Sequence, residues 1–133
     1  MEARALKKYI RSSPRKMRLV IDLIRGKKAY EALNILKFLN KLAAKDAERV
    51  LVSAISNLNN KADEADERIS DDEIIVKQAF VNVGPMMKRI QPAPMGRAHR
   101  IRKRSNHLTI VVGTNDAVPT DEDLEEIIAN NKE

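Results

Sequence analysis

Apolar residues recur at helical spacing in three successive segments between residues 14 and 58. Ser12, Ser13 and Pro14 mark the start of the first segment, because serine accepts amide hydrogen bonds and proline needs no donor at the first helical position. Gly26 stands where a left-handed cap ends a helix. The spaced apolar residues are Met17, Val20, Ile21 and Ile24 in the first segment, Ala32, Leu33, Leu36 and Leu39 in the second, which starts at Ala29, and Ala47, Val50, Leu51, Ala54, Ile55 and Leu58 in the third, which starts near Leu42. We expect three helices that supply most of the core.

The pattern becomes polar after the third segment and then rich in β-branched residues. Residues 57–72 contain three asparagines followed by many acidic side chains, which predicts the end of the third helix and an exposed, mobile loop. Residues 74–83 and 107–112 are rich in β-branched residues and predict two antiparallel strands, and residues 3–10 are compatible with another strand. The expected fold class is therefore α+β, a compact domain of three helices and a small antiparallel sheet.

The segment between the two predicted strands has almost no apolar periodicity. It contains three prolines and two glycines, which argue against a regular ladder at its far end, and it is much longer than the loop of an ordinary hairpin. If about ten residues on each side extend outward at ~3.3 Å per residue, the segment reaches on the order of 30 Å from the core. Residues 85–105, which we call the finger, cannot fold by burial alone, so we expect a partner to hold them.

The length of 133 residues suits one core and is too short for two ordinary domains. We expect a single domain over residues 1–113, which includes the finger, followed by an acidic tail over residues 114–133. Thr120 and the acidic residues after it resemble a helix start. The tail is therefore expected to be weakly ordered, or a short helix that is marginal without a partner.

Positive charge is concentrated in two parts of the chain, within a formal net charge of +6. Residues 1–28 are strongly basic and residues 85–107 contain no carboxylate, whereas residues 63–73 and the tail are acidic. This segregation is typical of a surface that faces phosphates, because nearby acids would weaken its attraction to a polyanion. An ordinary solvated surface, the alternative, usually mixes both signs. The cations that we expect to bind RNA are Arg4, Lys7, Lys8, Arg11, Arg15, Lys16, Arg18, Lys88, Arg89, Arg97, Arg100, Arg102, Lys103 and Arg104.

The sequence also argues against several kinds of chemistry. It has no cysteine, which excludes disulfides, thiolate zinc sites and cysteine nucleophiles. Gly26 and Gly84 lack the neighbours of phosphate-binding glycine loops, and His99 and His107 lie among cations rather than further metal ligands. The acidic residues 63–73 lack the spacing of a calcium loop and are expected to form a solvated face. We therefore predict no catalytic site, no metal and no cofactor, and a protein that is not an enzyme.

No run of residues approaches the ~18 consecutive apolar positions that a membrane-spanning helix requires. Glu2 and Arg4 place charges near the start of the chain, where a signal peptide would lead into an apolar stretch. We therefore expect a cytoplasmic protein without membrane contact.

Three ordered blocks of the sequence resemble one known family. SPRKMRLVIDLIRGK at 13–27, GPMMKR at 84–89 and GRAHRIRKRSNHLTIVV at 96–112 are similar to bacterial large-subunit ribosomal protein number twenty-two. The resemblance covers roughly residues 2–112 and implies a compact α+β domain from which a long β-hairpin protrudes. It further implies that the domain binds 23S rRNA of the large ribosomal subunit beside neighbouring ribosomal proteins and supports assembly, while the hairpin lines the exit tunnel of the nascent polypeptide.

Carried onto this chain, the resemblance assigns RNA contacts in the first block to Ser13, Arg15, Lys16 and Arg18. In the finger it implies RNA contacts from Lys88, Arg89, Gly96, Arg97, Arg100, Lys103 and Arg104, and a tunnel-lining surface formed by Met87, Lys88, Arg89, Pro94, Met95, Gly96 and Arg97. Ala93, Pro94 and Met95 depart from the family pattern, in which further basic residues often stand shortly before the glycine.

Several of these residues have a second interpretation. Arg97 and Arg100 have the forked geometry that suits phosphate, but arginines on a loop also serve as solubilising charges. Ser12 and Ser13 either bind phosphate at the helix start or only cap the helix. The methionines of this region either line a path for the passing polypeptide or fill gaps against RNA bases.

Two other classes of function compete with a ribosomal role. A free-standing RNA or DNA chaperone would bind backbones with little sequence preference, and a high-salt wash would remove it from large subunits because phosphate contacts alone would hold it. An adaptor that binds other proteins through the acidic tail would leave the finger unexplained.

We predict that the isolated protein keeps a folded body while residues 85–105 move freely, because burial orders the body and only RNA orders the finger. Amide relaxation measured by NMR tests this, since order parameters in the finger should fall below ~0.6 while those of the helices stay near ~0.85. Equal order in both parts would show that the finger is rigid without RNA.

Overall fold

The computed structural model describes residues 1–114, and its mixture of strands and helices confirms the expected α+β class. The elements, in chain order, are β1 (Glu2–Ile10), α1 (Pro14–Ile21), α2 (Ala29–Phe38), α3 (Leu42–Glu64), the short 3-10 helix η1 (Asp71–Glu73), β2 (Ile74–Val83), β3 (Met87–Pro92), the 3-10 turn η2 (Pro94–Gly96), β4 (Ala98–Lys103) and β5 (Asn106–Thr114). The expected acidic tail lies, from residue 115 on, outside the described residues.

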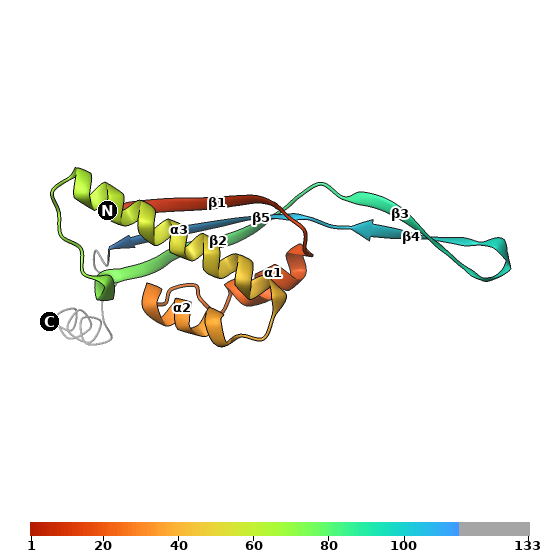
Figure 1. Cartoon of the computed structure of the whole chain (residues 1–133), viewed down its shortest axis with the longest axis horizontal. Helices are drawn as coiled ribbons and strands as arrows, with labels where there is room; N and C mark the ends of the chain where they lie inside the picture. Colours follow the sequence, from red (N-terminus) through yellow and green to blue (C-terminus); the bar gives the residue numbers. More distant parts are fainter. Residues whose placement is uncertain (115–133) are drawn as a thin grey trace, which may run out of the picture.

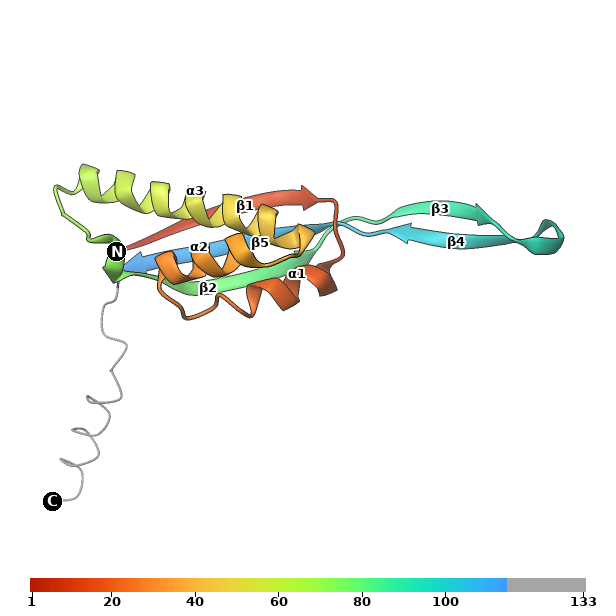
Figure 2. The ribbon, with the colours of Figure 1, turned by 60° about the horizontal axis from the view of Figure 1, so that its bottom comes forward.

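A three-stranded antiparallel sheet forms the base of the body, which comprises the described residues outside the finger, and β5 lies between β1 and β2. The two strands predicted from β-branched residues, β2 and β5, are antiparallel neighbours as expected. Alternate residues of each strand face the helices, so Ala5, Ile110 and Ala79 form one buried row across the sheet. Figures 1 and 2 show the three α-helices on this one face of the sheet.

The core between the sheet and the helices is small and aliphatic, as the sequence predicts. α3 packs across β1 and β5, α1 packs on β2, and α2 packs on both α3 and β2. Ala44, Ala47 and Ala54 on the buried side of α3 keep side chains short where the helix crosses the sheet, so that the two backbones lie close together. Both tyrosines and both phenylalanines are exposed, so the bulk of the core comes from Leu, Ile, Val and Met.

α1 is shorter than the sequence pattern predicts. It ends at Ile21, and turns rather than further helix connect it to Gly26. Gly26, at a φ of 75°, donates its N–H to the Val76 carbonyl oxygen at 3.0 Å. The Val76 N–H in turn donates to the Lys27 carbonyl oxygen at 2.9 Å. The chain thus bonds to the edge of β2 instead of continuing the helix, while Ile24 keeps its expected place in the core.

α3 is longer than predicted, and the expectation that its asparagine-rich segment ends it was wrong. The helix continues to Glu64. Asn57 Nδ2 donates to the Arg4 carbonyl oxygen at 3.0 Å, and Lys61 Nζ donates to the Glu2 carbonyl oxygen at 2.9 Å. Because β1 is an edge strand, these side chains satisfy backbone carbonyls that no neighbouring strand could reach, and the contact extends the helix.

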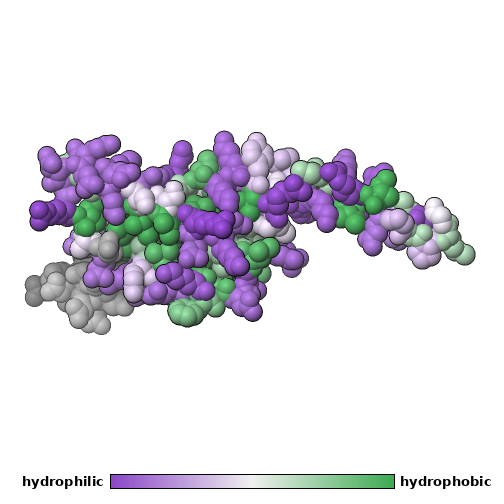
Figure 3. All heavy atoms as spheres, in the orientation of Figure 1, coloured by the Kyte–Doolittle hydropathy of each residue, from purple (hydrophilic) through white to green (hydrophobic). Residues whose placement is uncertain are grey.

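The finger is a two-stranded hairpin that projects from one end of the body (Figures 1 and 3). β3 and β4 pair from Met87 opposite Lys103 to Pro92 opposite Ala98. The expected disruption of the ladder by prolines and glycines therefore holds only for residues 93–97. Both strands of such a ribbon are edges, where a proline is tolerated.

Close contacts join the root of the finger to the body. The Gly84 N–H donates to the Ser105 carbonyl oxygen at 2.9 Å, and Ser105 Oγ donates to the Pro85 carbonyl oxygen at 2.6 Å. A Cβ at position 84 would lie 2.5 Å from Ser105 Oγ, so only glycine fits here without a shift. Asn106 is fully buried and donates from Nδ2 to the carbonyl oxygen and the hydroxyl of Ser12, both at 2.8 Å. The root is thereby linked to the segment that precedes α1.

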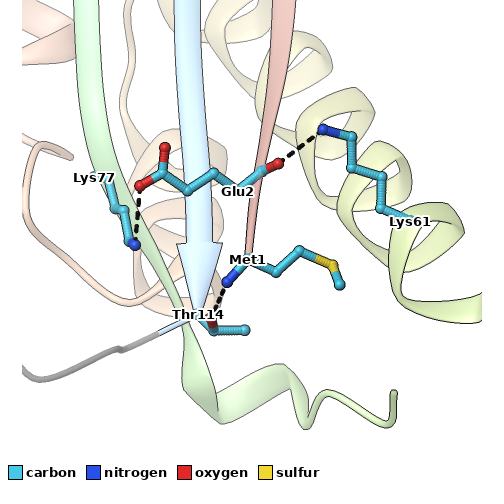
Figure 4. Close-up of polar contacts among 5 residues, drawn as sticks. All are labelled: Met1, Glu2, Lys61, Lys77 and Thr114. Carbon is cyan, nitrogen blue, oxygen red and sulfur yellow. Dashed lines mark hydrogen bonds and ion pairs between the residues drawn. The ribbon is translucent and has the colours of Figure 1, made fainter. Parts of the chain in front are cut away.

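Polar contacts also hold the opposite end of the sheet (Figure 4). The Met1 ammonium donates to Thr114 Oγ1 at 2.8 Å, and the Thr114 N–H donates to the Met1 carbonyl oxygen at 3.1 Å. The Glu2 carboxylate pairs with Lys77 Nζ at 3.0 Å. These contacts connect β1 to the end of β5 and to β2.

We predict that Gly84→Ala lowers the free energy of unfolding by about 1–3 kcal/mol, the usual cost of forcing extra volume into a close contact. Ser105→Ala removes the nearest atom, so Gly84→Ala should cost less in that background, although the Ser105 carbonyl carbon at 3.1 Å still limits the space. Urea unfolding of the four proteins of this cycle measures both costs. Equal costs in the two backgrounds would show that Ser105 Oγ does not limit position 84.

Candidate nucleic-acid interface

The finger carries positive charge on both faces of its ladder. Directly paired residues lie on the same face, so one face holds Lys88 opposite Arg102, with Arg100 two residues further on. The other face holds Arg89 and Lys103. Like charges opposite each other destabilise a hairpin in water, and within residues 1–114 no carboxylate forms an ion pair with a residue of the finger. A polyanion bound along the finger would turn this repulsion into attraction.

The tip of the finger is a tight turn. Met95 and Gly96 have φ values of 62° and 68°, and two successive positive values are typical of a type I′ turn. The Arg97 N–H closes this turn on the Pro94 carbonyl oxygen at 3.4 Å. Pro94 and the three residues after it thus gather at the far end of the finger, whereas the other predicted tunnel-lining residues, 87–89, lie near the root. The structure therefore places the predicted tunnel surface in two separate groups.

The first turn of α1 presents free cations beside an uncapped helix start. Pro14 and Met17 are buried, whereas Arg15 and Lys16 are exposed. Ser13 occupies the N-cap position but makes no side-chain capping hydrogen bond, so capping alone does not account for it. The first amides of a helix have no acceptor within the helix and attract anions. This turn is therefore suited to a phosphate.

Two of the predicted RNA-binding cations have partners within the body. Lys7 Nζ lies 2.6 Å from Asp46 Oδ1 of α3, in a partly buried ion pair. Arg18 donates from Nη2 to the Val81 carbonyl oxygen of β2 at 3.2 Å. The carbonyl group leaves the charge of Arg18 unbalanced, and the residue is exposed. Lys7 has its charge balanced by a carboxylate, so it offers the smaller attraction to RNA.

The remaining predicted cations of the body follow β1. Arg4 and Lys8 are exposed on this strand, and Arg11 is exposed just after it. The neighbours of Arg4, which are Ala3 and Ala5, face the core, so Arg4 lies on the sheet face that the helices leave open. The cations of the body are therefore spread over more than one face of the molecule.

An open hollow of about 600 Å³ lies beside the start of α1. Its lining residues come from the segment before α1, from α1 itself and from the start of α3, and they are Arg11, Ser12, Ser13, Lys16, Leu19, Lys41, Leu42 and Ala43. Lys41 is not among the cations that the sequence predicted to bind RNA. No local pattern marks it, because only the packing of α3 against α1 brings it beside Arg11 and Lys16.

The two histidines lie on different strands, His99 on β4 and His107 on β5. His107 Nδ1 accepts a hydrogen bond from the Tyr9 N–H at 3.0 Å, and the two rings meet edge to face with centroids 4.9 Å apart. His99 is exposed on β4. Within residues 1–114, no cluster of three or more His, Cys, Asp or Glu side chains is arranged to hold a metal ion. None of the helices in that part of the chain is both long and apolar enough to cross a membrane.

The fold and the charge pattern together define a class of protein, a small basic α+β domain with a projecting cationic hairpin that suits a polyanionic partner. A family model described as Ribosomal protein L22p/L17e matches residues 5–113 of the chain. The chain belongs to this family, which makes it a structural constituent of the large ribosomal subunit and not an enzyme. The resemblance seen in the three sequence blocks is thereby confirmed.

Similar proteins from three bacteria carry the name Large ribosomal subunit protein uL22. The protein of Christiangramia forsetii is 53% identical over 105 residues, which are 79% of this chain and 76% of that protein. The protein of Flavobacterium johnsoniae is 54% identical over 102 residues, or 77% and 73% of the two chains. The protein of Staphylococcus aureus is 49% identical over 112 residues, or 84% and 92%.

We predict that Arg15→Gln combined with Lys16→Gln weakens RNA binding and makes it less dependent on salt. Each lost phosphate contact should lower the slope of log affinity against log salt by about 0.7–0.9. Filter binding to large-subunit rRNA at several salt concentrations measures this slope. Lys37→Gln with Lys45→Gln removes the same charge from exposed positions outside the predicted set and serves as the control. Equal changes in both double variants would mean that only the net charge matters.

Proposed function

We propose that this protein binds 23S rRNA through the start of α1 and through the finger. In this proposal it supports assembly of the large subunit in the ribosomes of the cytoplasm, and its finger lines the exit tunnel of the nascent polypeptide. Its partners would be the rRNA, neighbouring ribosomal proteins and the nascent chain. The finger carries this proposal, because it is a hairpin with cations on both faces, no carboxylate and no core of its own.

The finger gains little stability from folding in water. A two-stranded hairpin is marginal without a third strand or a hydrophobic face to pack, and all residues of β3 are exposed. The pairing of Lys88 with Arg102 adds electrostatic repulsion. Phosphates on either face remove that repulsion, and the release of their counterions adds affinity. RNA is therefore the partner that best explains a hairpin of this composition.

The arginines and Gly96 suit close contact with an RNA backbone. Arg97, Arg100, Arg102 and Arg104 each present a planar fork of donors that matches two phosphate oxygens. A Cβ at Gly96 would meet nothing within 4 Å, so open space surrounds this part of the tip. We propose that this space lets a phosphate backbone approach the main chain.

The body and the finger have different parts in this proposal. Arg15 and Lys16, together with the first amides of α1, provide a docking site on a packed helix, which suits a firm attachment. The finger then extends from a root that Gly84 and Asn106 hold in place. We infer that residues 1–113 act as one domain, in which the body anchors the protein and the finger reaches inward.

The end of the finger has the chemistry expected of a tunnel wall. Its residues are less polar than those nearer the body, as Figure 3 shows by the paler colours at the tip. Met95 is 92% exposed, and Ala93 and Pro94 beside it are uncharged. A flexible thioether makes weak, adaptable contacts, which suits a surface that many different polypeptides pass. We propose that the passing polypeptide, rather than RNA bases, is the partner of Met95.

Membership of the ribosomal family also favours this role over a free-standing chaperone that would use the same cations. The two functions differ in how the protein is retained, because a chaperone held by phosphates alone would dissociate in a high-salt wash. Co-sedimentation with large subunits after such a wash therefore accompanies the test below.

We predict that a shortened finger leaves incorporation into large subunits largely intact and alters the tunnel. Residues 90–100 are removed, and Arg89 is joined to its ladder partner Ile101 by Asn-Gly, which favours the two-residue type I′ turn. Purified subunits from cells that express only this variant should contain it at nearly normal stoichiometry, because α1 and the ladder next to the root remain. Stalling of nascent chains should change, because Met95 and Arg97 are gone.

The double variant Arg15→Gln with Lys16→Gln is the matched control, since it should lower incorporation while subunits that do contain it stall as usual. Subunits that lack the shortened protein or fail to mature would show that the tip is an assembly anchor. Unchanged stalling would show that the tip does not shape the tunnel.

A further inference from the structure

The hollow between the starts of α1 and α3 combines an apolar floor with a cationic rim. We propose that it holds one unpaired nucleotide of the RNA, with the base on the floor and the neighbouring phosphates on the rim. This inference rests on the proposed RNA binding and names the feature of the RNA that this part of the surface recognises. The volume of about 600 Å³ lies within the ~300–1,000 Å³ typical of sites for small ligands.

The floor consists of aliphatic side chains that the fold leaves open to water. Leu19 of α1 is 59% exposed and Leu42 of α3 is 76% exposed, and both line the hollow beside the buried Ala43. Covering two leucines with an apolar surface is favourable at roughly 25 cal/mol per Å² of area removed from water. The flat face of a nucleobase is such a surface, and every base has one.

The rim consists of three cations from separate segments. Arg11 follows β1, Lys16 lies in the first turn of α1, and Lys41 immediately precedes α3. No acidic residue lines the hollow, and none of the three cations forms an ion pair within residues 1–114. Such a rim attracts the phosphates on either side of a nucleotide.

The serines add hydrogen-bond donors to this rim. Ser12 Oγ accepts from Asn106 Nδ2 at 2.8 Å, so its own hydrogen remains to be donated to an anion. Asn106 is fully buried and therefore holds Ser12 in place before any ligand arrives. Ser13 makes no capping bond, which leaves its hydroxyl available as well. A phosphate would thus meet two hydroxyl donors, of which Ser12 is already held in position.

An unpaired nucleotide accounts for more of these features than other occupants do. The backbone of paired RNA would use the rim but leave the leucines uncovered, since its bases are stacked inside the helix. An acidic peptide with an apolar side chain would satisfy both parts. However, the hollow shares Ser13 and Lys16 with the surface that we propose for rRNA, and this continuity favours RNA.

The test uses the full chain and protein-free 23S rRNA as the probe. Leu19→Ala with Leu42→Ala should weaken binding by about fivefold, as expected for losing part of the leucine burial, without changing the salt slope. Chemical modification at base edges should reveal one unpaired base that the intact protein protects and this variant leaves reactive. Lys41→Gln should lower both the affinity and, by about 0.7–0.9, the salt slope. Val52→Ala, at an exposed apolar position of α3 that does not line the hollow, is the control and should change neither.

The outcomes separate this inference from the proposal on which it rests. If the intact protein fails to bind the rRNA, the proposed function is wrong. If it binds, and the double leucine variant keeps the affinity and the same protected bases, the hollow holds no base. If that variant instead loses contact with a neighbouring protein in reconstituted subunits, the occupant is a polypeptide. Because both leucines are exposed, the double leucine variant should remain folded, and circular dichroism checks this. Lys41→Gln tests the cationic rim independently of the leucines.

Discussion

The close crossing of Gly84 and Ser105 is the contact on which the rest of the architecture depends. Here β2 passes into the finger and the finger returns as β5, the middle strand of the sheet. A shift of one residue at this crossing would exchange the buried and exposed faces of β5 and would also turn the finger. Asn106 extends the constraint to Ser12, so the sheet, the finger and the start of α1 share one fixed point.

The charges that suit the finger to RNA also oppose its folding. Lys88 and Arg102 attract phosphates and repel each other, and the ribbon has no second layer to bury. The body compensates with an aliphatic core and with α3 laid along the sheet. The body therefore supplies the stability, whereas the finger carries charge without a core, and the proposed partner completes the part that cannot stabilise itself.

Helical spacing and β-branching predicted which segments form helices and strands, but they did not predict all of the ends. α1 ends early because Gly26 bonds to Val76 of β2, and α3 continues because Asn57 and Lys61 bond to carbonyl groups of β1. Each end is decided by a hydrogen bond to a strand far away in the sequence. The ladder continues to Pro92 for a related reason, because a free ribbon edge tolerates a residue without an N–H.

The candidate RNA-binding surface was likewise predictable from the sequence only in part. The sequence by itself determined that the chain is α+β, that its cations and carboxylates are segregated, and that residues 85–107 carry no negative charge, because composition and periodicity are local properties. Only the tertiary structure decided that Lys7 pairs with Asp46 and that Lys41 joins Arg11 and Lys16 around one hollow. A charge is present in the sequence, but its effect depends on the distance to other charges, and packing sets that distance.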